Sequence, residues 1–206
     1  MRTIIWLLGL LALIVAGKAA FIWSGTYNIA ADEPHWTITE RVMETVRDRS
    51  IAVRASGIVV PDLDDEASIR AGAGNYDAMC TGCHLKPGVE KTEQSDGLYP
   101  APPELARNRI DDPAAAFWVI KHGIKMSGMP AWGKSMEDEY IWGMVAFLRQ
   151  LPDMSQDRYV ELVEASGGHA HSGADAASQE HDAGAGHMPA ADAVTEDHSK
   201  APPHEH

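Results

Sequence analysis

The chain has 206 residues, of which 45% are hydrophobic, and a net charge of −13 at pH 7. This length suits one domain with additional segments rather than two full domains, and the acidity excludes nucleic acid as a partner, since phosphate binding needs a basic surface. The charge is uneven, because residues 1–56 sum to +1, residues 57–160 to −6 and residues 161–206 to −8.

The first predicted element is an apolar helix that follows the basic residue Arg2. Residues 4–23 contain a single lysine and supply about the twenty residues that a helix needs to cross a bilayer. Two interpretations stay open: a signal peptide with a weak cleavage site at 17–19, or a membrane anchor with Trp23 at the far interface. In either case the rest of the chain is exported, so we expect a single-pass protein of the inner membrane with its domain in the periplasm.

A second helix is expected at 37–54. Thr37 and Glu40 stand in capping-box spacing, and a thin apolar stripe runs from Val42 to Ile51 among several arginines. A juxtamembrane stalk and a docking face for a membrane partner are both compatible with this pattern. The extended connector GIVVPDLDD follows.

Three further helices and no strand are expected in the next hundred residues. The first leads into the cysteines, at 64–80, and the Gly- and Pro-rich stretch that follows it is expected to be loop. The second has Asp112 as its N-cap, Pro113 at its first position and Gly123 at its end.

The third of these helices precedes Pro152 and has the clearest amphipathic pattern. Its predicted core-facing residues are Ile141, Val145, Leu148 and Leu151. The chain therefore divides into four predicted segments: an anchor or uncleaved signal at 1–25, a juxtamembrane helix and linker at 26–60, an all-α domain at 61–160, and a tail at 161–206.

The tail is rich in His, Ala and Asp, and from about Ser166 it has almost no large apolar residue. Such a composition cannot bury enough surface to fold, so we expect disorder. Seven of the ten histidines lie here, including the pairs His169/His171 and His204/His206. A solvating tail and a binding site for divalent metal ions are both open interpretations.

The stretch AMCTGCHLKPG contains both cysteines of the chain, Cys80 and Cys83, followed directly by His84. Closely spaced cysteines serve disulfides, zinc sites, dithiol redox motifs or covalent haem. Zinc lacks the further paired ligands that it needs, a redox dithiol lacks its βαβ setting, and a disulfide leaves His84 without a role.

Haem of the c type explains all three residues. On one helical turn, residues at i, i+3 and i+4 share a face. Cys80 and Cys83 can therefore each bond a haem vinyl group while His84 binds the iron, as the C-x-x-C-H signature indicates. The predicted cofactor is one covalently attached haem c.

With this motif, the loop GIKMSGMPAWG and the closing aromatic helix, the segment from Asp64 to Pro152 resembles the class I cytochromes c. The resemblance implies a small helical domain around one haem. It also implies a methionine as the second axial ligand, just before a proline. Met129 matches that position, and Met126 is the lesser alternative.

The resemblance also implies supporting residues. Gly72 and Tyr76 precede Cys80 as the family's first-helix glycine and aromatic do, with Tyr140 or Trp142 expected against Gly72. In the family a proline carbonyl accepts a hydrogen bond from the histidine; Pro103 is the best match, and Pro102 is the other candidate. Two roles are open for Trp132: contact with a haem propionate, or ordinary packing.

Histidine and methionine ligands leave iron with no open position, which predicts a one-electron carrier rather than an enzyme. The expected partners are a redox donor and a redox acceptor. Three lysines bracket the Met129 loop and could attract an acidic partner: Lys121, Lys125 and Lys134. Two alternatives are an electron-transfer subunit of a membrane oxidoreductase and a metal-binding or haem-sensing protein that uses the tail.

Overall fold

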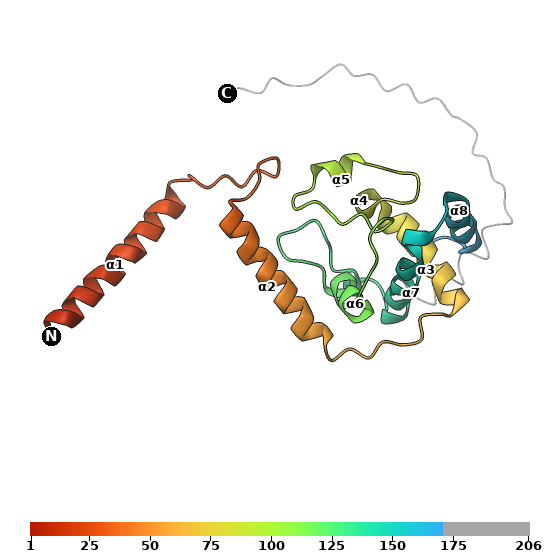
Figure 1. Ribbon diagram of the computed structural model, residues 1–206, viewed down its shortest axis with the longest axis horizontal. Helices are drawn as coiled ribbons and strands as arrows, with labels where there is room; N and C mark the ends of the chain where they lie inside the picture. The colour runs from red at the N-terminus through yellow and green to blue at the C-terminus, as the bar shows by residue number, and fades with distance from the viewer. Residues whose placement is uncertain (171–206) are drawn as a thin grey trace, which may run out of the picture.

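The computed structural model describes residues 1–170, and within that range every regular element is a helix (Figure 1). The predicted all-α fold is confirmed for these residues. In chain order the elements are α1 (Arg2–Trp23), α2 (Thr37–Ala55), α3 (Glu66–Met79), α4 (Thr81–His84), α5 (Glu93–Gly97), α6 (Pro113–His122), η1 (Trp132–Lys134), α7 (Asp138–Gln150), η2 (Leu151–Asp153) and α8 (Gln156–Ala165).

Helix α1 stands apart from the remaining helices (Figure 1). None of its 22 residues is buried, and the helix is about 33 Å long at 1.5 Å per residue. It is long and apolar enough to cross a membrane, a property that signal sequences near an N-terminus share. The predicted apolar segment is therefore present as a single helix.

Helix α2 packs against α6. Its N-cap is Trp36, with ψ 138° and no side-chain capping bond. The predicted capping box of Thr37 and Glu40 is wrong, because Thr37 already lies inside the helix and its hydroxyl is not placed to cap it.

The core forms where α3 crosses α7. Gly72 faces Gly143 at the crossing, and a Cβ on Gly72 would overlap the carbonyl group of Gly143 and lie 2.9 Å from the nitrogen of Met144. A Cβ on Gly143 would lie 2.9 Å from the oxygen of Ser68. The expectation that Gly72 lets the last helix approach closely is confirmed, and the atoms nearest the missing Cβ belong to the backbone of Gly143 and Met144 rather than to Tyr140 or Trp142.

Around the crossing, apolar side chains of α3, α6, α7 and α8 form one cluster. The fully buried ring of Tyr76 packs on Phe147 with 5.5 Å between ring centroids. The predicted core-facing stripe of α7 is confirmed, because all four residues are buried: Ile141, Val145, Leu148 and Leu151.

Local capping signals place α6 as expected. The carboxylate of Asp112 accepts hydrogen bonds from the backbone of Ala114 and Ala115, Pro113 is the first helical residue, and Gly123 at the C-cap has a φ of 64°. This confirms the predicted start and end of the helix. Its end matters because the loop after Gly123 carries Met126 and Met129.

Two α-helices were not expected. The five-residue helix α5 interrupts the predicted loop, closed by a capping box of Thr92 and Ser95. Helix α8 crosses the predicted boundary between residues 160 and 161, because its Tyr159 and Leu162 are buried in the core. The predicted disorder and metal binding of the tail concern residues that, from 171 onward, lie outside the described part of the chain.

We expect Gly72→Ala to lower the free energy of unfolding by about 2–3 kcal/mol, because the added methyl group has no space against the α7 backbone. The matched control is Gly57→Ala, where no atom lies within 4 Å of the added Cβ and the change should stay within about 0.5 kcal/mol. Guanidinium unfolding of the purified chain, followed by circular dichroism, measures both. Equal stability of the two variants would contradict the close crossing.

Candidate functional site

The two cysteines and His84 lie on one continuous helical turn. Cys80 ends α3 and begins α4, and its carbonyl oxygen accepts hydrogen bonds from the N–H groups of Cys83 (3.1 Å) and His84 (2.8 Å). This geometry brings the three side chains to one side of the turn, as the i, i+3, i+4 spacing predicts.

The cysteines carry free thiols in this structure. Burial, with the neighbouring Cys83 as the smaller cause, raises the pKa of Cys80 to about 12. A reactive redox cysteine must be a thiolate, which this environment disfavours. Among residues 1–170, no group of three or more His, Cys, Asp or Glu side chains is placed to hold a metal ion.

The imidazole of His84 is held by the loop that follows it. Its Nδ1 lies 2.9 Å from the carbonyl oxygen of Pro103. Because a carbonyl only accepts, Nδ1 must carry the proton, which leaves Nε2 with a lone pair for a metal. Burial lowers the pKa of His84 and the bond to Pro103 opposes that shift, so the ring is neutral near pH 7.

Further bonds fix the backbone on both sides of His84. Its carbonyl oxygen accepts from the N–H of Leu105 at 3.2 Å. The hydroxyl of Tyr76 donates to the carbonyl of Leu85 at 2.6 Å, with the carbonyl of His84 at 3.3 Å. Leu85 has a φ of 64°, a conformation that is rare for residues other than glycine, and it turns the chain sharply away from α4.

The loop from Gly123 to Pro130 presents two methionines differently. Met126 is 92% exposed, whereas Met129 is half-buried against the core cluster. The N–H of Ile124 donates to the carbonyl of Met129 at 3.2 Å, and the N–H of Met129 donates to the hydroxyl of Ser127 at 3.2 Å. The loop is thus folded back on the end of α6.

Gly123 is required for this loop. A Cβ there would lie 2.7 Å from the carbonyl oxygen of Met129 and 2.7 Å from the carbonyl carbon of Pro130. Its φ of 64° is also a conformation that suits glycine. The residue that ends α6 therefore also allows the Met129 loop to lie close beneath it.

The remaining predicted site residues lie at the end of α6, in the loop that follows it and in η1. Trp132, in η1, is half-buried against the core, as its packing role would require. Lys125 and Lys134 are exposed, whereas Lys121 pairs with Asp138 at 2.7 Å. Two of the three predicted lysines are therefore free of ion pairs within the described part of the chain.

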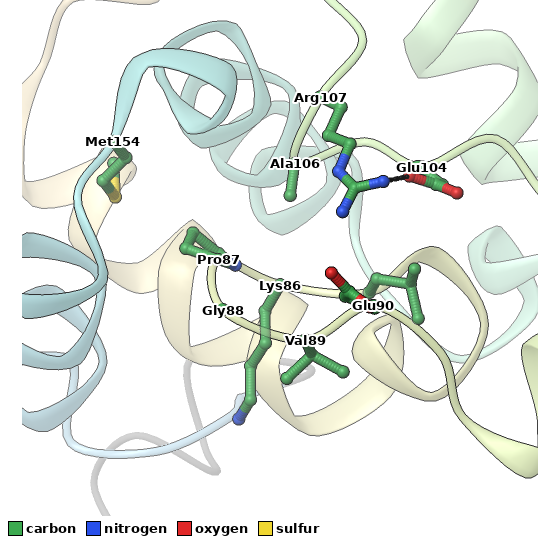
Figure 2. A pocket seen from close by; sticks show the side chains of 10 residues that line it. Lys86, Pro87, Gly88, Val89, Glu90, Glu104, Ala106, Arg107 and Met154 are labelled. Carbon is green, nitrogen blue, oxygen red and sulfur yellow. Dashed lines mark hydrogen bonds and ion pairs between the residues drawn. The ribbon is translucent and has the colours of Figure 1, made fainter.

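A cavity of about 300 Å³ lies beside the loop that follows His84 (Figure 2). It is bounded by residues 85–90 and by Glu104, Ala106 and Arg107, with Met154 at one side. Cys80, Cys83, His84 and Met129 do not line it. The cavity therefore abuts the loops that support His84 and is separate from the candidate ligands.

These observations fit a c-type haem. The site offers two unbridged thiols for covalent attachment, an imidazole whose Nε2 is available, and a half-buried thioether on a second loop. Nitrogen and thioether sulfur are the axial donors found in electron-transfer haem proteins. The donor set does not fit a closed zinc site, which needs four ligands.

Sequence reasoning missed two parts of the arrangement. The hydrogen bonds of Tyr76 to the carbonyls after the motif have no local sequence signal, since they join residues eight and nine apart through a turn. His35 had no predicted role. Its ring Nδ1 lies 2.8 Å from the hydroxyl of Tyr27, and its backbone N–H donates to the hydroxyl of Tyr99 at 3.1 Å.

Residues 67–148 match the family model described as Cytochrome C oxidase, cbb3-type, subunit III. The match begins at the start of α3 and ends within α7, so it spans the α3–α7 core and both loops. This segment is therefore similar to a cytochrome c domain, and the similarity supports a covalently bound c-type haem that transfers electrons. No curated protein and no solved structure matches the chain.

We expect Tyr76→Phe to lower the free energy of unfolding by about 1–2 kcal/mol, because it leaves the buried carbonyl of Leu85 without its donor while the ring still packs on Phe147. Tyr27→Phe is the control, since water can replace the hydroxyl of that half-buried residue. Denaturant titration measures both variants. An unaltered stability of Tyr76→Phe would show that the hydroxyl does not hold the loop.

Proposed function

We propose that this chain is a membrane-anchored one-electron carrier with one haem c, attached through Cys80 and Cys83 and ligated by His84 and Met129. The observation that carries the proposal is the bond between His84 Nδ1 and the Pro103 carbonyl. It sets the tautomer in which Nε2 faces outward as a base, an arrangement typical of metal-ligating histidines.

The chemistry of the cofactor would be one-electron oxidation and reduction at an iron with no open coordination position. The residues of the chain would restrict the iron to electron transfer by holding its two ligands in place. The Pro103 carbonyl orients His84 and makes it a stronger donor. The hydrogen bonds of Ser127 with the carbonyl of Ile124 and the N–H of Met129 hold the Met129 loop in its folded conformation. We propose no catalytic activity for the chain.

The choice of Met129 over Met126 rests on burial and on backbone conformation. Met126 is 92% exposed and has a φ of 59°, so its side chain lies in solvent. Met129 packs against the core and precedes Pro130, which keeps its backbone extended. A thioether that is already half-buried loses less conformational freedom on binding iron.

The proposed location is the outer face of the inner membrane. Helix α1 would span the bilayer with Arg2 on the cytoplasmic side, and the cytochrome c domain would lie in the periplasm. Lys125 and Lys134 beside the Met129 loop are the proposed attraction site for an acidic redox partner.

We expect Met129→Ala to remove the charge-transfer absorption of thioether-ligated ferric haem, lower the reduction potential by on the order of 0.1 V and allow carbon monoxide to bind the reduced form. Met126→Ala is the control and should change none of these. Visible spectroscopy and redox titration of the purified chain measure the effects. Identical spectra of Met129→Ala and the unmodified chain would overturn the assignment.

Covalent attachment is checked on the same samples. Acid–acetone extraction should leave the colour on the protein in both variants, because Cys80 and Cys83 are unchanged. Extraction of all colour from the unmodified chain would contradict haem c.

A second candidate function is favoured by the family model, which describes a subunit of an oxidase. In that case the chain would pass electrons within a membrane complex. Purification in mild detergent separates the two candidates. Stoichiometric recovery with a larger membrane oxidoreductase supports the subunit, and recovery of the chain alone supports the carrier.

A further inference from the structure

Helix α2 begins beside the last turn of α1. The ring of Trp36, its N-cap, lies 5.8 Å from the ring of Phe21 and 5.0 Å from that of Tyr27. Because Phe21 belongs to the last turn of the apolar helix, α2 starts at the level where α1 ends. Figure 1 shows α2 running across the direction of α1 rather than continuing it.

The two sides of α2 have different surroundings. One side packs on α6, and Thr39, Ile51 and Ala55 are half-buried or buried there. The other side carries a row of aliphatic residues that we call the outer stripe: Ile38 (68% exposed), Val42 (52%), Val46 (59%) and Val53 (64%). Their spacing of four, four and seven residues places them on one helix face.

Arginines without an ion pair in the described residues lie within and beside the outer stripe. Arg49 lies in the same row, between Val46 and Val53, and Arg41 lies at its edge. Neither makes an ion pair within residues 1–170, whereas Arg47 pairs with Asp48 at 2.7 Å and Arg54 bonds Ser50. Residues 37–55 hold four arginines and three carboxylates, a net charge of +1, against −6 for residues 57–160.

We propose that α2 is an interfacial helix whose outer stripe lies in the headgroup region of the membrane that α1 spans. The inference rests on the proposed membrane anchorage. A helix face that combines exposed aliphatic side chains with unpaired arginines suits a position in the plane of a bilayer surface. Arg41 and Arg49 reach lipid phosphates while their stems cover the apolar boundary.

A second contact joins the helical domain to the juxtamembrane segment between α1 and α2. The backbone N–H of His35 donates to the hydroxyl of Tyr99, and the two side-chain rings meet edge to face with 5.1 Å between their centroids. The domain is therefore joined to the juxtamembrane segment at Tyr99 and along α6. With α2 on the lipid surface, these two contacts fix the orientation of the domain relative to the membrane.

The test uses the full, haem-loaded chain in vesicles of phosphatidylcholine and phosphatidylglycerol. Val46→Cys and Glu44→Cys are each labelled with a polarity-sensitive fluorophore, since the haem cysteines are blocked by their thioether bonds. Glu44 is exposed on the helix side away from the outer stripe, so it is the matched control. Nitroxide-bearing lipid is the quencher. Energy transfer to haem lowers the fluorescence equally with and without this lipid, so the ratio of the two intensities reports quenching by the lipid alone.

We expect quenching at position 46 to be about threefold stronger than at position 44. A third label at Leu11→Cys, within α1, reports the anchor separately through a nitroxide deep in the acyl chain. Equal, weak quenching at 46 and 44 with strong quenching at 11 overturns the interfacial position of α2 and leaves the anchor intact. Weak quenching at 11 overturns the anchor itself.

Coverage of the outer stripe by protein gives a different signal. If a second copy or a partner subunit occupied the stripe, the label at 46 would report an apolar environment without quenching by nitroxide lipid. That result would also overturn the proposal.

Discussion

The close approach of two backbones, at Gly72 in α3 and Gly143 in α7, is the constraint on which the domain depends. With no Cβ between them, α3 and α7 lie near enough for Tyr76 to pack on Phe147 and for the remaining apolar side chains to close the core. Cys80 and His84 continue directly from α3. Any change in the crossing would therefore move the turn from Cys80 to His84 relative to the rest of the domain.

Two loops from different parts of the chain carry the remaining candidate residues. One brings the Pro103 carbonyl to His84, and the other brings Met129 against the core under the end of α6. Both loops are held by backbone bonds, Leu105 to His84 in the first and Ile124 to Met129 in the second. Hydrogen bonds of the main chain are independent of side-chain identity, so these loops keep their shape while their exposed side chains are free to vary.

The sequence predicted those features that depend on local chemistry. The limits of α6 follow from Asp112, Pro113 and Gly123, which act within their own turn, and the buried face of α7 follows from its periodicity. The hydrogen bond of Pro103 to His84 was expected from a family resemblance, since no local pattern links residues 19 apart.

Features that depend on pairs of distant elements were not predictable in the same way. Which α7 residue meets Gly72 is decided by the crossing geometry, and the crossing selects Gly143 rather than an aromatic residue. Helix α8 has only a short apolar pattern beside a polar tail. Its Tyr159 becomes buried because Asp77 accepts from its hydroxyl at 2.8 Å and Phe147 packs on its ring.

The contact between His35 and Tyr99 has a consequence for how electrons arrive. Tyr99 follows Leu98, and the side chain of Leu98 packs closely on Gly128, where an added Cβ would lie 2.6 Å from it. The juxtamembrane residue His35 and the Met129 loop therefore both contact the segment Leu98–Tyr99. If α1 spans a membrane as proposed, a chain held in this way would meet donors that travel in the same bilayer by lateral diffusion. Its turnover would then follow the surface density of those donors in the membrane rather than their concentration in the surrounding volume.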